Sequence, residues 1–83
     1  NQDWALRGRG GFSGEEYLRA IDRVVQWAAR ESMYTLLDLQ WLQADTPYGP
    51  DRQFIAPLPD AESAVLWEML AERYRSEPAV LFD

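Results

Sequence analysis

The sequence contains no cysteine and no histidine. The lack of cysteine excludes a disulfide framework and a thiolate metal site. The lack of histidine removes the most common general base and the most common transition-metal ligand, so a Ser-His-Asp triad cannot be assembled within these residues. No apolar run reaches the roughly 18 residues that a transmembrane helix needs. These absences exclude catalytic centres based on a thiol or an imidazole.

The charge is uneven along the chain. Residues 1–32 hold five arginines and five acidic residues, a net charge of zero, whereas residues 33–83 hold three arginines and nine acidic residues, a net charge of −6. An acidic surface disfavours phosphate backbones and anionic membranes. We therefore expect neither nucleic acid nor membrane as a partner, while a neutral polymer such as a polysaccharide is compatible. The 47% hydrophobic and 13% aromatic content predicts a folded globular chain.

The longest apolar run is MYTLLDLQW, residues 33–41. It predicts a strand buried on both faces, and the amphipathic segments before and after it predict helices that cover a parallel sheet. Side chains alternate along a strand, so Tyr34, Leu36, Asp38 and Gln40 are expected on one face. In such α/β folds the active site lies at the carboxyl ends of the strands, which makes Gln40 a candidate. The alternative is that Asp38 and Gln40 only satisfy polar groups in a core.

The rest of the chain divides into short elements. We predict a loop at 1–12, a helix at 13–32, a loop at 42–59, a helix at 60–76 and the start of a second strand at 79–83. The run SGEE at 13–16 is a capping box, and Asp60 is placed to cap the second helix. The apolar face of the first helix is predicted from Leu18, Ile21, Val25 and Ala28, joined by Tyr17 and Val24, and that of the second from Trp67, Leu70, Ala71 and Tyr74. The other charged residues of both helices, Arg73 among them, are expected to face water.

The run YTLLDLQW, with SGEEYLRAIDRVVQWAARES before it and PLPDAESAVLWEMLAERYRSEPAVLFD after it, resembles family 5 glycoside hydrolases, the cellulase-type TIM (β/α)8 barrels. In many members the third strand reads close to YVILDLHW, a loop rich in Pro and Asp leads to a helix with a Trp, and a fourth strand similar to AVIFDLFNEP follows. The likeness covers essentially 1–83. A complete barrel needs about 250 residues, so the resemblance implies an excised or processed segment of a barrel.

The resemblance also implies a function. The parent protein is expected to be a retaining endo-β-1,4-glucanase, secreted and without a cofactor, that hydrolyses β-glycans. Its acid/base glutamate is expected just beyond Asp83 and its nucleophile on a later strand, so residues 1–83 hold no catalytic residue and are expected to be inactive alone. Gln40 stands where many members carry histidine. Its amide can hydrogen-bond a sugar hydroxyl but cannot titrate near neutral pH.

Aromatic residues at the same rim offer flat apolar surface to sugar rings. The predicted substrate contacts are Gln40, Trp41, Tyr48, Phe54 and Trp4. The alternatives stay open: Trp4 could fold back onto its own domain, and the other loop aromatics could pin the long loop. No metal site is predicted, because Asp45, Asp51 and Asp60 lack the spacing of a calcium loop.

The open edges of two parallel strands predict a further partner. Unpaired edges and the exposed face of the central strand invite association, so we expect contact with the remainder of a barrel, or self-association, aggregation or unfolding of 1–83 alone. Two other functions remain open at this stage. One is a small non-catalytic α/β interaction module that binds a protein through its acidic loop, and the other is a non-hydrolytic sugar-binding relative. Asp38 and Asp83 could pair across neighbouring strands, although a structural role for both is the preferred interpretation.

Overall fold

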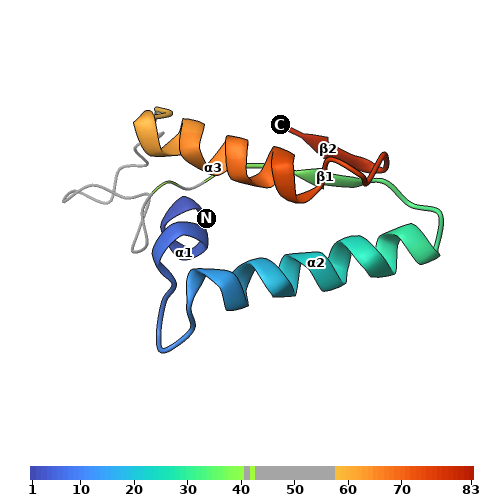
Figure 1. The fold of residues 1–83 in the computed structure, drawn as a ribbon, viewed down its shortest axis with the longest axis horizontal. Helices are drawn as coiled ribbons and strands as arrows, with labels where there is room; N and C mark the ends of the chain where they lie inside the picture. Colours follow the sequence, from blue (N-terminus) through green and yellow to red (C-terminus); the bar gives the residue numbers. More distant parts are fainter. Residues whose placement is uncertain (41, 43–57) are drawn as a thin grey trace, which may run out of the picture.

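The computed structural model describes residues 1–40, 42 and 58–83, and within these residues the chain is a small mixed α/β fold (Figure 1). Its elements are α1 (Gln2–Arg7), α2 (Gly14–Arg30), β1 (Thr35–Leu37), α3 (Ala61–Arg73) and β2 (Val80–Phe82). No helix in this described part is long and apolar enough to cross a membrane.

The two strands are parallel and adjacent, with Thr35 beside Val80, Leu36 beside Leu81 and Leu37 beside Phe82. This pairing confirms the predicted α/β class with parallel strands, joined by a crossover through α3. The regular strand is shorter than the predicted 33–41. Hydrogen bonds nevertheless continue the ladder beyond β1, because the N–H of Leu39 donates to the carbonyl of Asp83 (3.3 Å).

The prediction of a loop at 1–12 is wrong for its first half. Residues 2–7 form α1, whose N-cap Asn1 accepts a hydrogen bond from the N–H of Trp4 (3.2 Å). The helix ends at Gly8, whose φ of 83° is a left-handed conformation that favours glycine. A side chain there would also clash with the carbonyl oxygen of Phe12. The glycine-rich sequence therefore predicted a loop correctly only from residue 8 onward.

Both predicted caps are confirmed. Glu16 donates its N–H to the hydroxyl of Ser13 (3.1 Å), while its carboxylate accepts from the N–H of Ser13 (2.8 Å). Asp60 accepts from the N–H of Ser63 (2.9 Å) at the start of α3. Helix α2 ends at Arg30, and Ser32 follows with φ at 56°, the left-handed position where glycine is usual.

The buried face of α3 differs from the predicted stripe. Leu66, Leu70 and Tyr74 are buried, whereas Trp67 is only partly buried and Ala71 is exposed. The helix is therefore rotated toward Leu66, because that face meets α1 and α2. On α2, Leu18 and Val25 are buried as predicted, but Val24 is 51% exposed.

The core lies between the three described helices on one side of the sheet. Its buried members are Ala5, Leu18, Val25, Leu66, Leu70 and Tyr74. Gln2 is also buried, because its amide donates to Asp60 (3.0 Å) and its carbonyl oxygen accepts from the hydroxyl of Ser63 (2.7 Å). In this way the first turn of α1 is tied to the first turn of α3.

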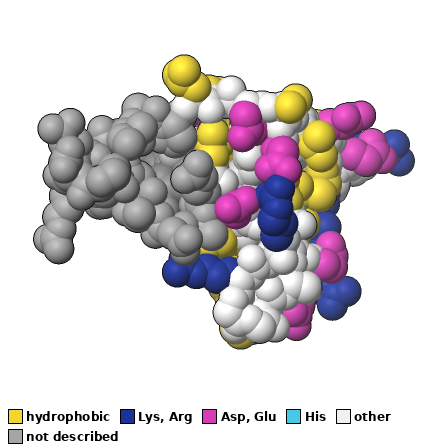
Figure 2. All heavy atoms as spheres, turned by 90° about the vertical axis from the view of Figure 1, so that its left-hand side faces the viewer, with side chains coloured by type: hydrophobic (Ala, Val, Ile, Leu, Met, Phe, Trp, Pro, Cys, Tyr) yellow, Lys and Arg dark blue, Asp and Glu magenta, His cyan; other side chains and the backbone are white. Residues whose placement is uncertain are grey.

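Charged side chains add a second tie between these helices. Arg7 pairs with Asp3 (2.7 Å) within α1 and with Glu62 of α3. Figure 2 shows acidic and arginine side chains next to one another on this end of the molecule, with hydrophobic side chains between them. The charged residues of α1 and α3 therefore form pairs of opposite charge here, not a patch of one charge.

The opposite face of the sheet is uncovered by described residues. Tyr34 is 73% exposed, Leu36 57% and Leu81 49%. The prediction of a strand buried on both faces is therefore wrong for the part of the chain that the structure describes, and the expected exposure of this face is confirmed.

Candidate functional site

The candidate site is the uncovered face at the carboxyl end of β1. Asp38 and Gln40 are exposed, as are Tyr34 and Leu36, while the residues between them are partly buried. This alternation confirms that the four side chains share one face. The sequence thus predicted which groups converge here.

Asp83 joins this face from the neighbouring strand. The pairing of Leu37 with Phe82 places Asp38 beside Asp83 one step further along, and the N–H of Asp83 donates to the carbonyl of Leu37 (2.9 Å). Two carboxylates and one amide therefore lie at the ends of adjacent parallel strands. No cluster of three or more potential metal ligands of the His, Cys, Asp or Glu type occurs in the described ranges.

Beside β1, between α1, α2 and α3, lies a cleft of about 540 Å³. Its described lining consists of Asn1, Trp4, Ala5, Tyr17, Leu18, Ile21, Leu36, Leu37, Asp38, Leu39, Gln40, Leu66, Trp67 and Leu70. The walls are mainly apolar, and the polar groups lie near the end of β1. Gln40 is thus open to a cleft, and the structure brings it together with Trp4, another predicted contact residue.

Trp4 is held by its own domain. Its ring meets Tyr17 edge to face, with centroids 5.8 Å apart, and the guanidinium of Arg9 lies 4.9 Å from the ring centroid. The indole Nε1–H is buried and has no hydrogen-bond partner among the described residues. An orphaned buried donor of this kind costs about 1–3 kcal/mol.

The other predicted contacts, Trp41, Tyr48 and Phe54, lie outside the described residues. Asp45 and Asp51, two of the aspartates considered for a calcium site, also lie outside the described residues.

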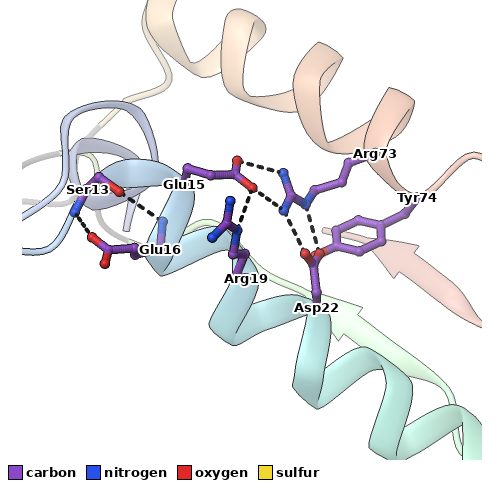
Figure 3. A network of polar contacts seen from close by, with 7 residues as sticks. All are labelled: Ser13, Glu15, Glu16, Arg19, Asp22, Arg73 and Tyr74. Atoms are coloured by element: carbon purple, nitrogen blue, oxygen red, sulfur yellow. Dashed lines mark hydrogen bonds and ion pairs between the residues drawn. The ribbon is translucent and has the colours of Figure 1, made fainter.

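A polar network joins α2 to the end of α3 (Figure 3). Arg73 donates from Nε to Oδ1 of Asp22 (2.8 Å) and from Nη2 to Oδ2 (2.6 Å), and it also reaches Glu15 (3.1 Å). Tyr74 donates its hydroxyl to Asp22 (2.8 Å). The prediction that Arg73 and the charged residues of the first helix face water is therefore wrong for Arg73 and Asp22.

The network shifts the titration of its members. The hydrogen bond from Arg73 lowers the pKa of Asp22, with a smaller contribution from Tyr74. Burial, followed by the hydrogen bond to Asp22, raises the pKa of Tyr74. Arg73 makes four hydrogen bonds to Asp22 and Glu15 of α2, and this arrangement holds the two helices together. The sequence did hold a sign that Asp22 faces the interior. Asp22 lies four residues after the buried Leu18, and positions four apart share a helix face.

No protein-family model, no curated protein and no solved structure matches this chain.

Proposed function

We propose that residues 1–83 form part of a carbohydrate-active (β/α)8 barrel of the glycoside hydrolase family 5 type, and that the parent protein cleaves β-1,4-linked glucan or a related β-glycan. The observation that carries this proposal is the convergence of Asp38, Gln40 and Asp83 at the carboxyl end of two parallel strands. Helices cover one face of these strands and the polar groups lie on the other, which is the arrangement of a barrel interior and its catalytic rim.

In this role Gln40 binds a sugar hydroxyl through its amide, which can donate and accept at once. Asp38 lies two residues deeper on the same strand and accepts hydrogen bonds from neighbouring groups. Retaining hydrolysis needs an acid/base carboxyl group and a nucleophilic carboxylate about 5 to 5.5 Å apart. In the proposed barrel both come from outside 1–83, so this segment binds the glycan and does not cleave it.

The test is a titration of the 83-residue chain with a soluble β-1,4-linked gluco-oligosaccharide, followed by amide NMR. We expect shifts at Asp38, Gln40 and Asp83, and no release of reducing sugar. Gln40→Ala should weaken binding about threefold to tenfold, the effect of one lost hydrogen bond. Gln26→Ala is the matched control, because Gln26 is an exposed glutamine on α2. Binding that is absent, or that Gln40→Ala leaves unchanged, would contradict the proposal.

A second candidate is a non-catalytic interaction module. The cleft beside β1 favours it, because its walls are apolar and it follows the edge of a strand. The acidic loop that first suggested a protein partner lies mostly outside the described residues.

A further inference from the structure

The edge of β1 that faces away from β2 carries backbone groups that pair with no described strand. In a parallel ladder the N–H and C=O of one residue point the same way, and successive residues alternate. Thr35 donates to Ala79 (2.8 Å) and Leu39 to Asp83 (3.3 Å), so the odd residues bond to β2. The backbone groups of Leu36 and Asp38 therefore point to the other edge, where no strand lies among the described residues.

The cleft runs along this same edge. Leu36 and Leu37 of β1 and the three residues that follow line it on one side, and Tyr17 and Ile21 line it from α2. On α2, Tyr17, Ile21, Val24 and Ala28 recur at i, i+4, i+7 and i+11, so they form one stripe, which we call the α2 side stripe. Its members are only partly covered, and Val24 is 51% exposed. An apolar helix surface thus extends alongside an open strand edge.

The chemistry of the cleft fits an extended peptide. The strand edge offers alternating donors and acceptors, and the walls are mainly apolar. A β-strand satisfies both at once, because its backbone pairs with the edge while every second side chain enters the apolar wall. An alkyl chain would leave the backbone groups unpaired.

The chain itself presents a matching strand edge. Residues 79, 81 and 83 of the second strand bond to β1, so the backbone of Phe82 points outward from β2. The Phe82 side chain is 43% exposed and lies on the helix side of the sheet, where it meets Trp67 with ring centroids 5.8 Å apart. Placed beside a second β1, this side chain would face the α2 side stripe.

We propose that β2 of one copy adds in parallel to the free edge of β1 in a second copy, beneath the α2 side stripe. The contact continues the parallel sheet, keeps the helices of both copies on the same face and fills the cleft. It is heterologous, since each copy uses a different edge, so it extends to further copies or closes into a ring. This inference concerns residues 1–83 as a separate chain, because in the proposed barrel the same two edges would pair with neighbouring strands, and a second copy in the cleft would compete with a glycan at Gln40.

The position of α2 decides between this pairing and a symmetric one. In Figure 1, α2 lies on the side of β1 away from β2, while α3 approaches the two strands with its C-terminal end. A symmetric pairing of two β1 edges that keeps the helices on one face would bring the two α2 helices together beside the joined strands. Pairing of two β2 edges would leave the cleft and the backbone groups of Leu36 uncovered. Only β2 against β1 covers both.

The first test compares two valines by analytical ultracentrifugation. Val24 (51% exposed) lies on the α2 side stripe, and Val65 (55% exposed) lies on α3 outside the proposed contact. We expect the wild-type mass to rise above 9.6 kDa between about 5 and 500 µM. Val24→Glu should weaken association at least tenfold, and Val65→Glu should associate like the wild type. Added salt should strengthen association, because each chain carries a net charge of −6.

Circular dichroism of both variants checks that the helices remain folded. A wild-type chain that stays monomeric over this range would overturn the proposal. An equal effect of Val24→Glu and Val65→Glu would overturn it as well, because association would then not depend on the α2 side stripe.

The second test fixes which edges meet, and it uses the absence of native cysteine. Leu36→Cys and Leu81→Cys place single thiols on the exposed faces of β1 and β2. With a short thiol-reactive cross-linker, a mixture of the two variants should give more covalent dimer than either variant alone. Self-linking of Leu36→Cys without a mixed product would show a symmetric β1 contact and overturn the proposal.

Discussion

The helical side and the sheet side of this molecule are built very differently. On the helical side, buried apolar residues from all three helices meet, both long helices start with reciprocal caps, and charged groups are paired across elements. On the sheet side, two strands of three residues expose apolar side chains, and no described strand pairs with the outer edge of β1. The contrast indicates that helix packing supplies the stability and that the sheet supplies the surface available for binding.

The largest expected effect comes from the core of the helical side. Leu70→Ala removes a side chain that is 6% exposed and should lower the free energy of unfolding by about 2–5 kcal/mol. Leu36→Ala, on the open face, should cost less than about 1 kcal/mol by the same reasoning. Urea unfolding of monomeric protein at low concentration measures both. Equal costs would show that the two sides contribute alike to stability.

A smaller effect is expected at the polar tie between α2 and α3. Asp22→Asn weakens the charged hydrogen bonds to Arg73 and should cost about 1–3 kcal/mol at pH 7. Glu72→Gln is the control, because the Glu72 side chain is 71% exposed in its pair with Arg75. The control should change stability by less than about 0.5 kcal/mol.

The same carboxylate sets a pH dependence. Since Arg73 lowers the pKa of Asp22 in the folded state, this residue stabilises the fold fully above its unfolded pKa of about 3.9. That contribution is lost as the pH falls through the lower folded pKa. Stability should therefore fall more steeply below about pH 4 in the wild type than in Asp22→Asn. Parallel curves for the two proteins would exclude Asp22 as the titrating group.

The smallest expected effect is a gain. Ser32 follows α2 with φ at 56°, a conformation that glycine adopts without steric cost. Ser32→Gly should raise the free energy of unfolding by about 0.5–1 kcal/mol. Ser76→Gly is the matched control, because Ser76 is not among the described residues with positive φ, and it should not stabilise. A stability gain of the same size in both variants would contradict the strain at Ser32.

The contrast between the two sides also explains what the sequence could predict. The capping box at Ser13, the Asp60 cap and the alternation from Tyr34 to Gln40 were predicted, because each depends on residues close together in sequence. The parallel pairing was predicted from an apolar run between two amphipathic segments. The caps and the alternation concern local conformation, and the parallel pairing of β1 with β2 agrees with the order of the elements along the chain.

The predictions that proved wrong depended on contacts between distant residues. Helix α1 is too short to form by itself and is held by the burial of Gln2 and Ala5 against α2 and α3. The rotation of α3 toward Leu66 follows from the same packing. Arg73 pairs with Asp22, which is 51 positions away in the sequence, and a local sequence pattern cannot predict a contact between such distant residues. In the candidate site, Gln40 lies at an open cleft, and the register places Asp38 beside Asp83, the pairing across neighbouring strands that the sequence had suggested.

Amide hydrogen exchange along β1 tests most directly whether its outer edge is open in the monomer and covered by a second copy. At about 5 µM the amides of Thr35 and Leu39, which donate to β2, should exchange more slowly than those of Leu36 and Asp38. At about 500 µM the amides of Leu36 and Asp38 should become protected to a similar degree. Protection of Leu36 and Asp38 in dilute monomer, or none at high concentration, would contradict this account.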